Sequence, residues 1–212
     1  SLGSVIAVIQ GPITLGSIMA VMLAAACTEA QPFFAVWQEG EAFVEAPGNG
    51  VKTVGEKSPA SGGQALWGLA LGKKGRSVRY EISLRHAVPN ARLIFRYARL
   101  FWKENMTDAV VVLELTYSGT TVQREARFGN TGGWGDNPVE WGLVTVEIGD
   151  MAAGTWNVTL TSTADDGDVC IDGFFVAPPE LLLTADELAS IQRVQIAANG
   201  YVGLRACTNL LD

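Results

Sequence analysis

The hydrophobic pattern of the chain changes abruptly near residue 31. Residues 5–27 read VIAVIQGPITLGSIMAVMLAAAC and contain no charged residue. As a helix this run would span about 35 Å at 1.5 Å per residue, enough to cross the hydrocarbon core of a bilayer. Gly11-Pro12 predicts a kink, or a helix that begins near Ile13. Residues 1–30 are therefore expected to form an apolar helix distinct from the rest of the chain.

Three interpretations of this helix are open. A secretory signal peptide normally has a basic N-terminal region, but no Lys or Arg occurs before Lys52. A lipoprotein signal is possible, because LAAAC ends in Cys27. A retained helix could insert in a membrane or pack against partner subunits. We expect retention, and hence an exported protein that is membrane-associated on the periplasmic or extracellular side.

From Gln31 onward, short alternations of apolar and polar residues replace the helical run. Turn-forming segments such as Pro47–Gly50 and Asp165–Asp168 separate them. The alternations predict strands over residues 34–43, 77–84, 93–100, 110–117, 143–148, 156–162 and 169–176. Seven strands at this spacing, with no helix between them, predict a mainly β protein whose residues 31–177 form an antiparallel β-sandwich.

A short helical tail is expected over residues 178–212. Pro178-Pro179 separates it from the sandwich, and Thr184 begins an N-cap pattern that leads into LASIQRVQIAANG. A helix over 184–199 would carry a narrow apolar stripe, which favours docking onto the sandwich or a neighbour. The stripe consists of Leu188, Ile191, Val194 or Gln195, and Ala198.

The composition excludes several classes of function. The 212 residues are 48% hydrophobic and 17% charged with a net charge of −7, which excludes a disordered chain and makes broad binding of nucleic acid unlikely. Three cysteines and one histidine exclude a disulfide framework, a zinc site and a histidine-based catalytic centre. Catalytic motifs are also missing, so we expect no enzymatic activity. Arg92 and Arg96 would point to one face of a strand and Arg99 to the other. A solvated sheet face is expected for this basic segment, and a patch for an anionic lipid or an acidic partner is the alternative.

Residues 37–177 resemble the carbohydrate-binding modules of families 6 and 35, which are galactose-binding-like jelly rolls. The resemblance implies a jelly-roll β-sandwich. It rests on five fragments in the order of the family: Glu39-Gly40-Glu41-Ala42, Pro59-Ala60-Ser61-Gly62-Gly63, Leu93-Ile94-Phe95-Arg96-Tyr97-Ala98, Thr131-Gly132-Gly133-Trp134 with Trp141, and Ile171-Asp172-Gly173-Phe174.

The resemblance also implies a structural calcium ion. In this chain Glu39, Glu41 and Asp172 would hold it, together with backbone carbonyls. Three converging carboxylates would repel one another without a cation. The alternative is that these are three surface carboxylates on edge strands.

Carbohydrate binding in such modules uses aromatic rings that stack on the sugar. The candidate rings are Trp134, Trp67, Tyr97 and Trp141. Trp134 lies among glycines and is expected to be exposed, whereas apolar strands favour a core position for Tyr97 and Trp141. The sugar-contacting Asn of the family is replaced by Cys170, and a thiol is a poor partner for a hydroxyl.

Two functions follow from these observations. The first is a non-catalytic, exported subunit with a structural role in a membrane-associated complex or a surface filament. Its N-terminal helix would provide the contact with other protein subunits or the membrane. The alternative is a cell-surface carbohydrate-binding module with a glycan as its partner.

Overall fold

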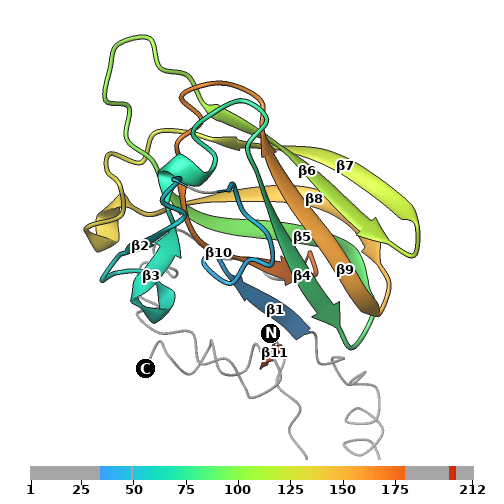
Figure 1. Ribbon diagram of the computed structural model, residues 1–212. Coiled ribbons are helices and arrows are strands. Elements are labelled where there is room, and N and C mark those ends of the chain that lie inside the picture. The colour runs from blue at the N-terminus through green and yellow to red at the C-terminus, as the bar shows by residue number, and fades with distance from the viewer. Residues whose placement is uncertain (1–33, 49, 180–200, 204–212) are drawn as a thin grey trace, which may run out of the picture. The chain divides into compact units, whose positions relative to one another are not determined.

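The computed structural model describes residues 34–48, 50–179 and 201–203, which form two antiparallel β-sheets (Figure 1). The seven-stranded sheet contains β1 (Phe34–Glu39), β2 (Val54–Glu56), β3 (Gln64–Leu66), β5 (Val88–Ala98), β8 (Gly142–Met151), β10 (Cys170–Ala177) and β11 (Tyr201–Gly203). The four-stranded sheet contains β4 (Ser77–Leu84), β6 (Ala109–Tyr117), β7 (Thr120–Phe128) and β9 (Gly154–Ser162). Three short 3₁₀ turns lie in the connections, at Ser61–Gly63, Pro138–Glu140 and Gly68–Ala70.

Strand β10 is the centre of the seven-stranded sheet. It pairs with β1 on one side and with β5 along its length on the other, and β8 continues the sheet beyond β5. The register of β10 against β5 shifts between Ile171 and Gly173, which places a β-bulge at Asp172. The four-stranded sheet has the order β4-β9-β6-β7.

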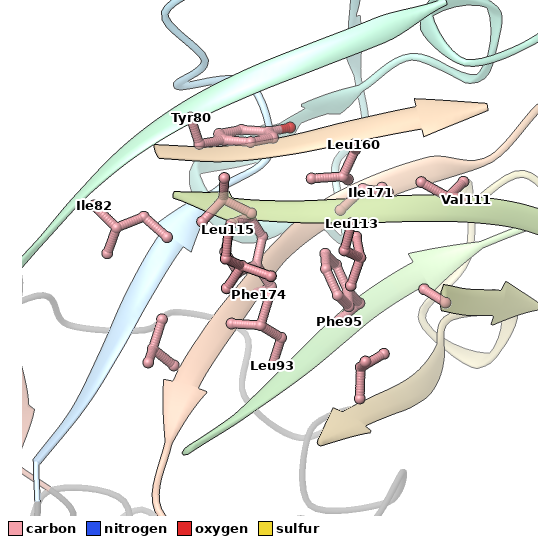
Figure 2. Close-up of a cluster of buried hydrophobic side chains, with 14 of the residues drawn as sticks. Tyr80, Ile82, Leu93, Phe95, Val111, Leu113, Leu115, Leu160, Ile171 and Phe174 are labelled. Atoms are coloured by element: carbon pink, nitrogen blue, oxygen red, sulfur yellow. The ribbon is translucent and has the colours of Figure 1, made fainter. Parts of the chain in front are cut away.

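The core lies between the two sheets and follows the alternation in the sequence (Figure 2). In β4 the inward side chains are Val78, Tyr80, Ile82 and Leu84, all buried. Aromatic rings join the layers, because Phe174 of β10 contacts Tyr80 edge-on at a centroid distance of 5.3 Å. The buried Tyr80 hydroxyl donates a hydrogen bond of 2.8 Å to the Gly40 carbonyl.

Strands β7 and β8 meet at one side of the sandwich, although they belong to different sheets. Arg124 of β7 donates hydrogen bonds to two carbonyls of β8, from Nε to Glu147 at 2.9 Å and from Nη2 to Ile148 at 2.9 Å. A single guanidinium therefore links the edges of the two sheets by hydrogen bonds to backbone carbonyls.

The structure confirms the antiparallel sandwich and all seven predicted strands, and its two-sheet form is consistent with a jelly roll. Strand β7 was not predicted, because in TTVQREARF only Ala126 and Phe128 are buried and the apolar alternation is weak. The three-residue strands β2 and β3 were also missed.

The flanking segments were predicted to be helical. The apolar helix at residues 1–30 and the helix at 184–199 lie outside the described residues. Within the predicted helical tail, Tyr201–Gly203 is a strand that pairs with the edge of β1, which corrects that part of the prediction. None of the helices in the described part of the chain is long and apolar enough to cross a membrane.

Candidate functional site

Several loops meet at one end of the sandwich. Thr131, in the loop between β7 and β8, donates its backbone N–H to the Arg99 carbonyl at 2.8 Å. Arg99 follows β5 and donates from Nε to the Asp168 carbonyl in the loop before β10. Lys57, just after β2, forms an ion pair of 2.7 Å with Asp136. These contacts bring four connections together into one surface, which we call the loop end.

A small hydrophobic cluster underlies the loop end and is separate from the main core. Five buried residues form it, and the half-buried Trp67 and Trp134 pack against them. The buried members are Ala60, Ala65, Ala98, Trp141 and Cys170. The structure therefore brings together three of the four aromatic residues predicted from the sequence.

Two of the predicted aromatic rings are buried and offer no free face to a sugar. Trp141 is 6% exposed, and the guanidinium of Arg96 lies 4.9 Å from its ring centroid. Tyr97 belongs to the main core, contacts Phe128 edge-on, and accepts a hydrogen bond from the Gly129 N–H at its hydroxyl. Tyr97 lies in β5 and Trp141 immediately before β8, and the burial of both rings gives them a packing role.

Trp67 is half-buried and lies against the backbone of β2. A Cβ atom at Gly55 would come within 2.2 Å of the Trp67 ring, so only glycine fits there. The ammonium groups of Lys52 and Lys57 lie 4.3 and 4.9 Å from the ring centroid, at cation–π distance. Trp67 is therefore an aromatic surface flanked by two cations.

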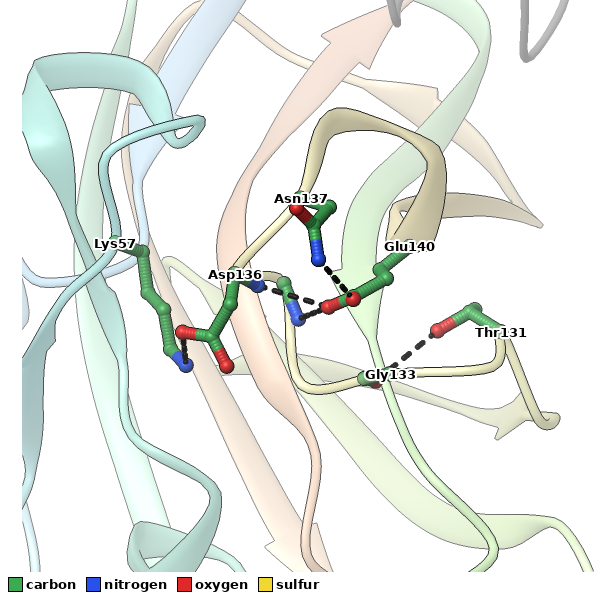
Figure 3. Close-up of polar contacts among 7 residues, drawn as sticks. Lys57, Thr131, Gly133, Asp136, Asn137 and Glu140 are labelled. Carbon is green, nitrogen blue, oxygen red and sulfur yellow. Dashed lines mark hydrogen bonds and ion pairs between the residues drawn. The ribbon is translucent and has the colours of Figure 1, made fainter.

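Trp134 sits in a loop that is held by internal hydrogen bonds (Figure 3). The Glu140 carboxylate accepts hydrogen bonds from the backbone N–H groups of Gly135 and Asp136, both at 2.9 Å, and from Asn137 Nδ2 at 2.6 Å. The Asn137 hydrogen bond lowers the pKa of Glu140, as do the backbone N–H groups. The loop is therefore ordered around one ionised carboxylate.

The loop brings Trp134 close to the segment that holds Trp67. The position of a Cβ atom at Gly68 would be 3.5 Å from the Trp134 ring, so the ring lies against the residue next to Trp67. Gly135 has a φ of +84°, and a Cβ there would approach Trp141 to 2.4 Å. Both the conformation and the close approach require glycine immediately after Trp134.

Arg99 holds the other loops of this end in place. Its side chain is buried and donates only to backbone carbonyls, those of Asp168, Thr107, Phe128 and Asp166, at 2.8–3.1 Å. Burial lowers the pKa of Arg99, and nearby carboxylates, Asp108 first among them, oppose that shift. The expectation that Arg96 and Arg99 lie on a solvated face was wrong, because both are buried and hydrogen-bonded.

Cys170 lies inside the small cluster and not on the surface. It is 1% exposed, and burial raises the pKa of its thiol to about 11. The side chain at this position is therefore a neutral packing group, in agreement with the expectation that it is a poor partner for a sugar hydroxyl.

The three predicted calcium ligands lie near one another around the turn at Ser61. The Ser61 hydroxyl donates to Glu39 Oε1 at 2.9 Å, and the Ser61 N–H donates to Asp172 Oδ1 at 2.6 Å. Burial raises the pKa of Glu41 to about 7, and the charges of Glu39 and Asp172 add to that shift. Burial also raises the pKa of Asp172 to about 6, against the lowering effect of Arg96.

The fit of this cluster to a cation is partial. Oε2 of Glu39 and Oε2 of Glu41 are buried and have no hydrogen-bond partner, so both are available as ligands. Asp172 is engaged, because its Oδ2 forms an ion pair of 2.5 Å with Arg96 and its Oδ1 accepts from Ser61. As arranged, no three acidic, histidine or cysteine side chains within the described ranges could hold a metal ion.

One exposed aromatic residue was not predicted. Trp102, in the loop between β5 and β6, is 55% exposed, and Lys103 Nζ lies 4.7 Å from its ring centroid. The signal in the sequence was a Phe-Trp-Lys run followed by polar residues. It is an exposed ring outside the cluster that contains Trp67 and Trp134.

No protein-family model and no curated protein matches this chain. Among solved structures, a family 35 carbohydrate-binding module from Clostridium thermocellum aligns with a TM-score of 0.50 at 18% identity, over 66% of this chain and 98% of that one. The sandwich described here has the fold of the carbohydrate-binding modules of families 6 and 35.

Two modules of family 6 align with similar identities and coverage and with slightly lower TM-scores. A β-1,3-glucan-binding module from Bacillus halodurans aligns with a TM-score of 0.47 at 19% identity, over 69% of this chain and 96% of that one. A module from Clostridium stercorarium, solved with cellobiose, aligns with a TM-score of 0.47 at 19% identity, over 67% and 92% of the two chains. At these identities a ligand is not implied.

Proposed function

We propose that this protein is a non-catalytic carbohydrate-binding module that binds a glycan at the loop end, with Trp134 as the main stacking platform. The observation that supports the proposal best is the half-buried Trp134 on a loop organised around Glu140. A ring that is fixed before binding loses little conformational freedom when a sugar stacks on it. Trp67 lies beside Trp134 and supplies a second aromatic surface.

The test of this proposal is affinity electrophoresis of the full chain in gels that contain different polysaccharides. We expect saturable retardation by at least one polysaccharide, and its loss in Trp134→Ala. Trp102→Ala is the matched control, since it removes an equally large exposed ring from another loop. Retardation that Trp102→Ala abolishes and Trp134→Ala leaves intact would place the sugar elsewhere and overturn the assignment of Trp134.

We also propose a structural calcium ion at the carboxylate cluster. Glu39 and Glu41 would supply ligands through their unpartnered oxygens, and backbone carbonyls would complete a shell of oxygens. A bound cation would offset the repulsion that raises the pKa of Glu41. Asp172 would join the shell only by exchanging its contact with Arg96.

Chelation tests the metal directly. Chelator is expected to lower the melting temperature of the full chain, and calcium is expected to restore it. The double substitution Glu39→Gln and Glu41→Gln should abolish this response. An equal melting temperature with chelator and with calcium, on protein shown by elemental analysis to be metal-free at the start, would contradict the proposal.

The structural role in a membrane complex or filament stays a prediction. It depends on residues 1–30, which lie outside the described residues. The expected protein partners and the exported, membrane-associated location depend on the same residues. The module fold supports a glycan as partner more directly than it supports another subunit.

A further inference from the structure

Part of the outer face of the seven-stranded sheet, which points away from the core, is apolar. The register places Trp37 opposite Phe175 and Phe175 opposite Ile94, so the three side chains form one row across β1, β10 and β5. Leu93 and Phe95, on either side of Ile94, point inward to the core. We call the row Trp37, Phe175 and Ile94 the outer patch.

The outer patch is buried, although it belongs neither to the main core nor to the cluster at the loop end. Trp37, Phe175 and Ile94 are 4%, 2% and 3% exposed. The rings of Trp37 and Phe175 also contact each other, with centroids 4.7 Å apart. Burial on a face that the described strands do not cover requires another part of the molecule over it.

The four-stranded sheet shows the pattern that a solvated outer face has. There the register aligns Arg79 with Thr159 and Thr159 with Glu114, which gives a polar row in the equivalent position. Antiparallel sheets with one face in water alternate in this way. A row of Trp, Phe and Ile on the other sheet is therefore a surface that is built to be covered.

The chain connectivity indicates which segment covers it. Strand β1 is antiparallel to β10 on one side and to β11 on the other, so β10 and β11 run parallel with β1 between them. Parallel strands need a crossover connection that returns along the length of the sheet, which is usually a helix. The inner face of β1 already contributes Val36 to the main core, so the outer face is the route that is open.

We propose that residues 180–200 cross the outer face of the seven-stranded sheet and cover the outer patch with the apolar stripe expected for a helix at 184–199. A helix of that length measures about 24 Å, which matches the length of a six-residue strand of about 20 Å with room to cross over β1.

The consequence is that the carbohydrate-binding-module fold carries an added layer in this protein. Strand β11 and the crossover would form one element, with β11 pairing with the edge of β1 and the helix covering the patch beside it. The proposal is independent of sugar binding, because the outer patch and the tryptophans of the loop end belong to different residue clusters.

Hydroxyl-radical footprinting of the full chain, read by mass spectrometry, tests this proposal. Trp37 is expected to label several-fold more slowly than Trp102, which is exposed and serves as the internal reference. Ile191→Asp places a charge on the apolar stripe and is expected to raise Trp37 labelling towards that of Trp102. Ala189→Asp introduces the same charge on the opposite face of the helix and is expected to leave Trp37 protected.

Other outcomes overturn the proposal. Rapid labelling of Trp37 in the unmodified chain would show that the face is uncovered. Protection that survives Ile191→Asp would assign the cover to another segment, and its loss in Ile18→Asp would identify the N-terminal run. Protection that falls on dilution would identify a second copy of the chain. Trp156 in the core reports global unfolding, and if Ile191→Asp exposes it, the milder Ile191→Ser decides by the same criteria.

Discussion

Replacement of Arg99 by Met should destabilise the protein strongly, although no carboxylate is its hydrogen-bond partner. Arg99 donates to four carbonyls from three separate segments, and its side chain is 1% exposed. Met keeps most of the apolar volume but leaves these carbonyls without their donor. A hydrogen bond from a charged group contributes about 1.5–3 kcal/mol, and an unsatisfied buried partner costs about 1–3 kcal/mol.

The expected loss is smaller than the sum of four such contributions. Removing Arg99 also removes the cost of burying a charge, the effect that lowers its pKa. Water can reach some of the freed carbonyls, because three of the four hydrogen bonds are only partly buried. We therefore expect a loss of about 3 kcal/mol in the free energy of unfolding, which corresponds to a fall of about 6–12 °C in melting temperature for a domain of this size.

Urea unfolding of the full chain, followed by tryptophan fluorescence, gives this free energy. Arg127→Met is the matched control, because Arg127 is 62% exposed and pairs only with the exposed Glu125. The control should change stability by less than about 0.5 kcal/mol. A loss below about 1 kcal/mol for Arg99→Met would refute the view that Arg99 fixes the loops, and would show that they keep their conformation without it.

Three further predictions concern other parts of the module. In metal-free protein the raised pKa of Glu41 means that the folded state holds a proton that the unfolded state has lost, so stability should fall as pH rises from about 4.5 to 7. The full shift corresponds to about 3 kcal/mol, of which we expect about half because Glu41 is partly exposed. Urea titrations at several pH values should show it, and Glu41→Gln should reduce it to the part that Asp172, with its pKa raised to about 6, contributes. Gly55→Ala should force Trp67 to move, seen as a red shift in tryptophan emission, whereas Gly48→Ala, which meets no neighbour within 4 Å, should leave the emission unchanged. Tyr80→Phe removes the buried hydrogen bond to Gly40 and should cost about 1 kcal/mol in urea unfolding, while Tyr117→Phe, whose hydrogen bond to Ala153 is exposed, should cost less.

The sequence predicts this fold well where one face of a strand is buried. Alternation identified β4 at its exact bounds, because Val78, Tyr80, Ile82 and Leu84 all point into the core. It missed β7, whose pairing with β6 comes from backbone hydrogen bonds and not from an apolar face. The short strand β11 depends on the edge of β1, which no local pattern in the tail encodes.

The candidate site is predicted less completely, for a physical reason. Aromatic residue type and flanking glycines selected Trp134 and Trp67, and strand alternation correctly favoured burial of Tyr97 and Trp141. The role of Arg99 could not be predicted, because its partners are carbonyls that every residue carries. Likewise, the ion pair of Asp172 with Arg96 lies at a β-bulge that the residue pattern does not show.

The link that Arg124 makes between β7 and β8 has a consequence for the behaviour of the protein in concentrated solution. A sandwich exposes open strand edges, and each is a template on which a strand of another molecule can add. Arg124 occupies two carbonyls of the β8 edge, and the long charged side chains of Arg127 and Glu125 flank the same side. That edge is therefore blocked against intermolecular strand pairing, so we expect no β-linked association of molecules through it at high protein concentration.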